Sequence, residues 1–137
     1  MIVLVDSSVW IDLFRSRSSP STTALEYLLR KRRVAIGDLI LTEVLQGFTS
    51  DAAFDRARQI LSLAAPLTIV DDAVALQAAI NYRTLRALGI TIRKTIDTLI
   101  ATRCILDRIP LLYSDRDFDP FVQHLGLRSA MDLPGVT

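Results

Sequence analysis

Four short, largely apolar runs divide the chain, and each has the length of a strand. They cover residues 2–5, 34–36, 67–70 and 109–113. Runs rich in Val, Ile and Leu, without a regular polar alternation, are typical of parallel strands that helices cover on both faces. The pattern therefore predicts four buried strands, and we expect a further edge strand near residues 127–130.

Segments with the apolar spacing of helices fill the intervals between these runs. Ser19 is a candidate N-cap before Pro20 at the first helical position, and Asp51 is a candidate cap for a helix that Pro66 ends. The predicted helices cover residues 9–14, 20–33, 39–48, 51–65, 72–88, 95–106 and 120–125. Strands that alternate with helices indicate a parallel sheet with right-handed crossovers. We therefore predict a three-layer α/β/α sandwich with a short, mainly parallel sheet of four or five strands.

The composition is that of one domain, residues 1–137. Half of the residues are hydrophobic, which suits a sheet covered on both faces and excludes a disordered chain. No run approaches the roughly 18 apolar residues of a membrane span, and no signal peptide is visible. Cys104 is the one cysteine, so an internal disulfide is excluded and a buried core residue is expected. We expect a soluble, cytoplasmic protein.

The net charge of +1 argues against a protein that binds nucleic acid through an overall basic surface. Residues 30–33 are nonetheless four consecutive cations. At the C-terminal end of a helix they interact favourably with the helix dipole. The alternative is a patch that faces RNA.

Acidic residues follow two of the predicted strands directly. Asp6 ends the first run, and Asp115 and Asp117 come just after the fourth. Open α/β sheets place their ligands at the carboxyl ends of the strands. If the fourth strand lies beside the first, Asp6 and Asp115 face one crevice. A lone Asp at such a place can also be a simple helix cap.

Two further acids lie inside predicted helices. Glu43 has Gly47 one turn later and no cation at that position, whereas Glu26 has Arg30 there and forms an ordinary surface pair. Asp97 lies on an apolar helix face, where a carboxylate has to be protonated, paired or bound to a metal. Its nearest candidate partners for a structural ion pair are Arg93 and Lys94.

Acids from four parts of the chain would repel each other strongly without a cation. Oxygen ligands alone favour Mg²⁺ or Mn²⁺ over zinc, which prefers His and Cys. The sequence thus predicts a site for a hard divalent cation.

Four segments carry a family resemblance. They are Val-Asp-Ser-Ser-Val-Trp-Ile at 5–11, Thr-Glu-Val-Leu-Gln-Gly at 42–47, Asp-Thr-Leu-Ile-Ala at 97–101 and Ser-Asp-Arg-Asp-Phe at 114–118. Together, in this order and at this spacing, they resemble the PIN-domain ribonucleases, and they are most similar to the VapC toxins of toxin–antitoxin pairs. The resemblance covers nearly the whole chain.

The resemblance implies roles for individual residues. It assigns metal binding and catalysis to Asp6, Glu43, Asp97 and Asp115, and a supporting acidic position to Asp117. Ser8 matches a polar position beside the first acid. A PIN-like fold and cleavage of structured RNA, such as tRNA or rRNA, by a metal-activated water are implied as well.

The resemblance also implies partners: a small VapB-type antitoxin that covers the active site, and a second copy of the chain in a homodimer. RNA affinity would come mostly from phosphate contacts, for which Arg93, Lys94 and Arg116 are the candidates because they flank the acids. Each of the three can instead neutralise a carboxylate.

Two other classes of function fit part of the pattern. Magnesium-dependent phosphatases and receiver-like phosphoacceptors also place an Asp after the first strand. The phosphatase pattern requires a second Asp two residues later, where this chain has Ser8. A receiver requires an acidic pair near the amino terminus and a late Lys, and this sequence shows neither feature. A binding module without activity is the third class, and the intact acids argue against it.

Overall fold

The computed structural model describes residues 1–136. Its sheet has four strands in the order β3-β2-β1-β4, and all three pairs are parallel. The strands are β1 (Val3–Val5), β2 (Val34–Gly37), β3 (Ala65–Leu67) and β4 (Leu111–Leu112). In place of the fifth strand that we expected, Ser129 makes a single parallel bridge to Leu111. The predicted α/β/α architecture with a four-stranded parallel sheet is confirmed.

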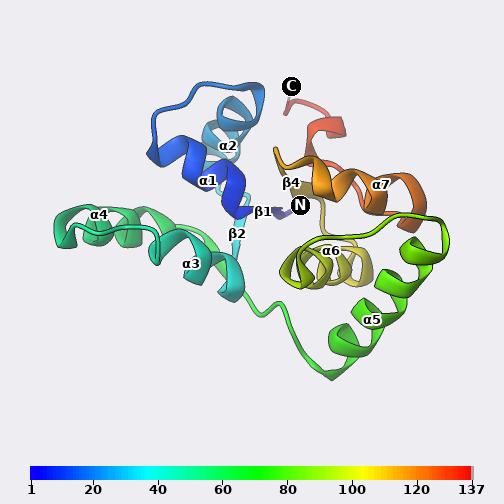
Figure 1. Ribbon diagram of the computed structural model, residues 1–137. Coiled ribbons are helices and arrows are strands. Elements are labelled where there is room, and N and C mark those ends of the chain that lie inside the picture. The colour runs from blue at the N-terminus through cyan, green and yellow to red at the C-terminus, as the bar shows by residue number, and fades with distance from the viewer. Residues whose placement is uncertain (137) are drawn as a thin grey trace.

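Helices lie on both sides of this sheet. Figure 1 shows α1 and α2 on one side and α5 and α6 on the other, while α3 and α4 extend away from the strands. The α-helices are α1 (Ser7–Phe14), α2 (Pro20–Arg30), α3 (Asp38–Leu45), α4 (Asp51–Leu61), α5 (Asp72–Ala87), α6 (Thr95–Asp107) and α7 (Asp119–Leu125). Two 3₁₀ helices, η1 (Arg116–Phe118) and η2 (Ala130–Asp132), complete the described elements.

Helix starts follow the expected capping chemistry at α2 and differ from it by one residue at α4. Ser19 caps α2 in a reciprocal pair with Thr22, and Pro20 follows it as predicted. The cap of α4 is Ser50, whose hydroxyl accepts from the Ala53 N–H, so our assignment of Asp51 was wrong by one residue. Either side chain can cap a helix, and the backbone turn before the helix decides between them.

The third strand also differs from the prediction. It spans Ala65–Leu67 and contains Pro66, which we had read as a helix terminator, whereas we expected the strand at residues 67–70. β3 is the outer strand beside β2, and an edge strand tolerates a proline because one side of it needs no hydrogen-bond donor. Ala65 and Pro66 are exposed and Leu67 is half-buried, so this strand does not need the continuous apolar run of a buried strand.

The core lies between the sheet and the helix layers. All residues of β1 and β4 are fully buried, as are Trp10, Phe118 and Phe121. Cys104 is also buried, and desolvation raises the pKa of its thiol, which makes it an inert core residue as predicted. Within residues 1–136, no helix combines the length and the apolar character that crossing a membrane requires.

The register of the sheet fixes which segments meet. Leu4 pairs with Ala35 on one side and with Leu111 on the other. The Asp6 N–H donates to the Leu112 carbonyl at 2.9 Å, so the carboxyl ends of β1 and β4 lie side by side. At the other end of the sheet, the Val3 N–H donates to the Arg33 carbonyl at 2.7 Å. The basic run 30–33 therefore adjoins the amino ends of the strands, away from the acids.

Candidate active site

Asp6 uses its two carboxylate oxygens differently. It is the N-cap of α1: Oδ2 accepts from the Ser8 N–H at 3.1 Å and from the Ser8 hydroxyl at 2.6 Å. Oδ1 is buried and has no hydrogen-bond partner among the described residues. The capping role that we considered for Asp6 is therefore real, but it leaves one oxygen available. Burial raises the pKa of this carboxyl, against the opposing hydrogen bonds from Ser8.

Ser8 also connects the ends of the two central strands. Its hydroxyl oxygen accepts from the Ser114 N–H at 3.4 Å while it donates to Asp6. Ser114 follows β4 and directly precedes Asp115. The Ser8 side chain therefore joins the carboxyl end of β1 to the segment after β4. The positions of Asp6 and Asp115 depend on this connection.

Asp97 lies in the first turn of α6 and is only 4% exposed. Its Oδ2 is buried and makes no hydrogen bond within residues 1–136. Desolvation raises the pKa of this carboxyl to about 7, and the negative charge of Asp6 adds to the rise while Lys94 opposes it. A carboxylate held in this way gains most from a bound cation.

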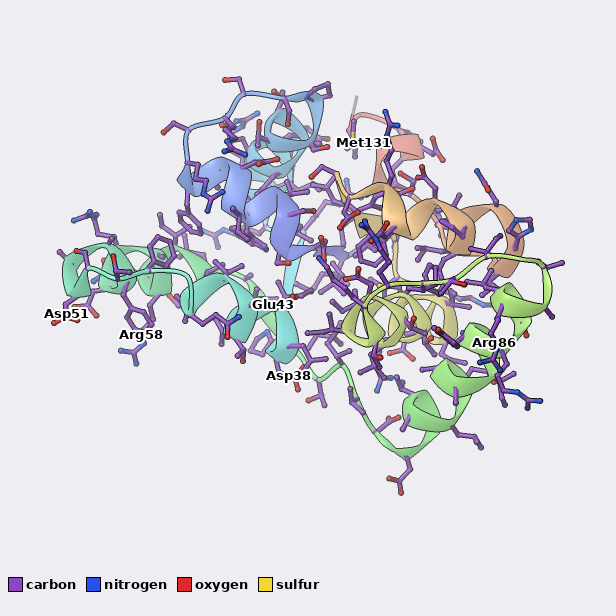
Figure 2. All side chains as sticks on the ribbon, in the orientation of Figure 1. Asp38, Glu43, Asp51, Arg58, Arg86 and Met131 are labelled. Carbon is purple, nitrogen blue, oxygen red and sulfur yellow. The ribbon has the colours of Figure 1, made fainter. Side chains whose placement is uncertain are left out.

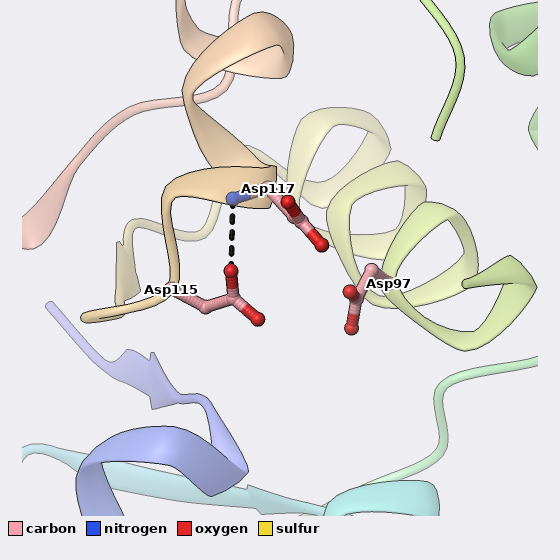
Figure 3. A group of neighbouring side chains, drawn as sticks. All are labelled: Asp97, Asp115 and Asp117. Carbon is pink, nitrogen blue, oxygen red and sulfur yellow. Dashed lines mark hydrogen bonds between the residues drawn. The ribbon is translucent and has the colours of Figure 1, made fainter. Parts of the chain in front are cut away.

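Asp115 and Asp117 approach Asp97 from the segment after β4. Figure 3 shows the three carboxylates directed into the same space between η1 and α6. One oxygen from each lies within 4.8 Å of the others, which is close enough for all three to reach one metal ion. Asp115 caps η1, because its Oδ1 accepts from the Asp117 N–H at 2.9 Å. That hydrogen bond holds the loop in the shape that brings both acids together.

Glu43 reaches the same region from α3. It lies next to the first turn of α1 (Figure 2), where the Ser7 hydroxyl donates to its Oε1 at 3.2 Å. Partial burial raises the pKa of the Glu43 carboxyl, and the nearby charge of Asp6 raises it further. Ser7 was missed by the sequence analysis, in which only the second serine of the Asp-Ser-Ser segment was singled out.

The structure thus brings five predicted acids together, and we call them the acidic cluster: Asp6, Glu43, Asp97, Asp115 and Asp117. Asp6 and Glu43 lie outside the group of three that a single ion could bridge. Both nevertheless act electrostatically on Asp97, since the charge of each raises its pKa. The members come from four separate segments of the chain.

Arg93 and Lys94 pair with members of the acidic cluster other than Asp97, the partner that we considered for them. Arg93 donates through Nη2 to both carboxylate oxygens of Asp117, at 3.1 and 3.2 Å. The Lys94 Nζ lies 4.0 Å from Oδ2 of Asp115. Neither forms an ion pair with Asp97, so that alternative was wrong: the loop before α6 directs both side chains toward the segment after β4. Arg116 is exposed and belongs to none of the ion pairs found within residues 1–136.

Asp119 does not cap α7, although it directly precedes Pro120. Phe118 occupies the cap position and Asp119 is the first residue of α7. Its Oδ1 accepts from the Tyr113 hydroxyl at 2.9 Å. This bond fastens the end of β4 to α7 and leaves Asp119 outside the acidic cluster.

Comparisons with known proteins agree with this arrangement. Residues 3–121 match the PIN domain family. The VapC ribonuclease Mb1587 of Mycobacterium bovis is 30% identical over 132 residues, which cover 94% of this chain and 98% of the relative. Ribonuclease VapC11 of Mycobacterium tuberculosis matches with the same identity and coverage.

Solved structures show the same fold. One is the crystal structure of VapBC2 from Rickettsia felis bound to a DNA fragment from their promoter, with a TM-score of 0.73, 19% identity, and coverage of 94% of this chain and 97% of that one. Another is a toxin–antitoxin complex from Klebsiella pneumoniae, with a TM-score of 0.66, 22% identity, and coverage of 93% and 96%. The chain therefore belongs to the PIN domain family, and its full-length relatives place it among the VapC ribonucleases. The phosphatase and receiver alternatives fall away with this assignment.

Proposed function

We propose that this protein is a divalent-metal-dependent endoribonuclease and the toxin of a toxin–antitoxin pair. The observation that carries the proposal is that two buried carboxylate oxygens of the acidic cluster, Oδ1 of Asp6 and Oδ2 of Asp97, have no hydrogen-bond partner within residues 1–136. Buried polar atoms are normally paired, and two of the four exceptions among the described residues are these carboxylate oxygens, which requires an explanation. A bound cation supplies one.

The residues present fit a hard divalent cation. Asp97, Asp115 and Asp117 would hold it most directly, with Asp6 and Glu43 completing the charge around it. The donors are all carboxylate oxygens, which favour Mg²⁺ or Mn²⁺. When bound, such a cation lowers the pKa of a water molecule and stabilises negative charge on the phosphoryl group.

Three hydrogen bonds within the protein hold the acids in position. Ser8 fixes the rotation of Asp6, Ser7 holds Glu43, and the Asp117 N–H fixes Asp115. The only histidine of the chain, His124, lies on α7 and is not part of the acidic cluster. Since no imidazole lies among these acids, we infer that proton removal from water depends on the carboxylates and the cation. Attack at phosphorus with departure of the 3′ oxygen leaves a 5′-phosphate and a 3′-hydroxyl.

The substrate and the partner follow from the relatives. Ribonuclease is part of the names of the relatives, and we propose a structured RNA such as tRNA or rRNA, with phosphate contacts from Arg93, Lys94 and Arg116. The similar solved structures are toxin–antitoxin assemblies, and we propose a VapB-type antitoxin and a homodimer for this chain. An RNA target places its action in the cytoplasm.

Cleavage of an end-labelled RNA tests the activity. The protein should cut it with Mg²⁺ or Mn²⁺ and stop when EDTA is added, and Asp6→Asn and Asp97→Asn should each abolish cutting. Asp55→Asn is the matched control, because it removes the same charge from an exposed position on α4. A folded double variant of Asp6 and Asp97 that still cuts would refute the proposal.

Growth of cells that express the chain tests the toxin role. Expression alone should arrest growth, and co-expression of a small protein from the adjacent gene should restore it. End-mapping of cellular RNA after brief induction would then identify the target. Unimpaired growth with abundant soluble wild-type protein would contradict the toxin role.

A further inference from the structure

Two exposed cations neutralise the more accessible half of the acidic cluster. The Arg93 side chain is 76% exposed and Lys94 57%, whereas the acids that they face, Asp117 and Asp115, are 20% and 29% exposed. Both cations lie in the segment just before α6, and Asp97 lies in the first turn of that helix. Long, exposed basic side chains of this kind can change partner without any movement of the backbone.

These pairs occupy the oxygens that a metal ion would need. Nη2 of Arg93 donates to both oxygens of Asp117, Oδ1 of Asp115 accepts from the Asp117 N–H, and Oδ2 of Asp115 lies 4.0 Å from the Lys94 ammonium. Within residues 1–136, the buried oxygens of the acidic cluster that have no hydrogen-bond partner belong to Asp6 and Asp97. A cation bound by all three of Asp97, Asp115 and Asp117 must therefore share or displace two ion pairs. Its charge also repels an ammonium and a guanidinium group at such short range.

We propose that Arg93 and Lys94 exchange partners: they neutralise Asp117 and Asp115 when no metal is bound, and they bind RNA phosphates once the metal has replaced them. This inference rests on the proposed metal-dependent ribonuclease function. Each side chain then has one role in the resting protein and another in the complex with substrate. The two roles compete, because the Nη2 group that donates to both oxygens of Asp117 cannot donate to a phosphate at the same time.

The exchange couples metal binding to RNA binding. Binding of the cation releases two positive side chains, so it raises the affinity for RNA, and by linkage RNA raises the affinity for the cation to the same degree. A metal-free protein would hold RNA weakly. Metal binding at the acidic cluster thus determines when the protein binds RNA, in addition to the role of the metal in cleavage.

Arg93→Gln and Lys94→Gln test the exchange, because it predicts opposite effects on the two affinities. Each variant removes a competitor for the acids, so Mg²⁺ should bind about two- to fivefold tighter in isothermal titration calorimetry, the range expected for loss of one exposed ion pair. Each also removes a phosphate contact, so affinity for RNA should fall and the slope of log K against log salt should decrease by about one. A role limited to structure would not tighten metal binding.

RNA affinity is measured by fluorescence anisotropy with a labelled hairpin, with and without Ca²⁺, at constant ionic strength, and a gel verifies that the RNA is intact. Wild-type protein should bind the hairpin more tightly with Ca²⁺, and this gain should shrink in both variants. Arg108→Gln is the control, since it removes one exposed positive charge next to the amino end of β4, away from the acidic cluster. It should leave the metal affinity and the gain unchanged.

The outcomes separate this inference from the proposed function. If wild-type protein binds Mg²⁺ but the two variants bind it equally or more weakly, or if Ca²⁺ does not increase RNA affinity, the exchange is wrong while the nuclease can stand. If wild-type protein binds no divalent cation at all, the metal-dependent function itself fails.

Discussion

The Ser7 hydroxyl donates a hydrogen bond of 3.2 Å to Oε1 of Glu43, a residue 36 positions further along the chain. The bond joins the first turn of α1 to α3, the helix that projects from the sheet in Figure 1. Glu43 is the one member of the acidic cluster on this projecting helix. A single hydroxyl therefore determines how the carboxylate of α3 is presented to the acids at the ends of β1 and β4.

Ser7→Ala removes this hydrogen bond and leaves every acid in place. We expect RNA cleavage and Mg²⁺ affinity to fall about tenfold, the size of effect that side chains orienting a metal ligand commonly have. Thermal stability should change little, because the bond is only partly buried. Ser62→Ala is the matched control, since that hydroxyl binds a carbonyl within its own exposed helix end. Equal loss of activity in both variants would contradict an orienting role for Ser7.

Asp97→Asn should stabilise the metal-free protein at neutral and alkaline pH. The folded chain raises the pKa of this carboxyl to about 7 from an ordinary value of 3.8. It therefore keeps a proton that the unfolded chain releases, and the stability of the wild type falls as the pH rises between these values. Asn has no charge to bury, so the variant should gain up to about 4 kcal/mol at pH 8 and almost nothing near pH 4.

Urea unfolding in EDTA at both pH values measures this difference in the free energy of unfolding. Asp55→Asn, on the surface of α4, should show no such dependence on pH. If Asp97→Asn and the wild type were equally stable at pH 8, the charge of Asp97 would have to be compensated in the folded protein.

Metal affinity should rise with pH through the neutral range. A cation competes with the proton that Asp97 retains, and the pKa of about 7 places this competition between roughly pH 6 and 8. Below that window the affinity should fall by close to tenfold per pH unit, because one proton leaves for each cation bound. Calorimetry in buffers of different ionisation enthalpy would count the released protons directly. Binding that is independent of pH would show that Asp97 is not a ligand.

Gly37→Ala should destabilise the fold at the start of α3. A Cβ at this position would lie 2.7 Å from Cδ1 and 2.9 Å from Cγ1 of Ile69, which is fully buried. Overpacking of this kind typically costs about 1–3 kcal/mol. Ile69→Val removes the Cδ1 methyl, so adding it to Gly37→Ala should recover part of the loss in a double-mutant cycle of unfolding free energies. No recovery would mean that the backbone is responsible.

Local sequence patterns determine much of the fold, and those parts could therefore be predicted. Uninterrupted apolar runs indicate strands buried on both faces, and β1 and β4 are such strands. The third strand could not be located in this way, because β3 lies at the edge, contains Pro66 and is mostly exposed. Its position depends on pairing with β2, which is a long-range contact.

In the candidate site, the acids could be predicted from the sequence but their partners could not. Acids that end strands or interrupt an apolar helix face can be recognised from their neighbours, and the five predicted acids do lie together. The partners of these acids could not be recognised. Arg93 pairs with Asp117, 24 positions away, although Asp97 is much nearer in the sequence, and Ser7 binds a helix 36 positions away. Such choices depend on the direction in which loops present their side chains.

The strand order β3-β2-β1-β4 places the last strand to be synthesised beside the first. A ribosome that stalls before β4 releases a chain that lacks Asp115 and Asp117, and in which the Asp6 N–H has no Leu112 carbonyl to bind. Synthesis must therefore pass the segment after β4 before the acidic cluster can form. A nascent chain that ends earlier carries only Asp6, Glu43 and Asp97 of the five acids.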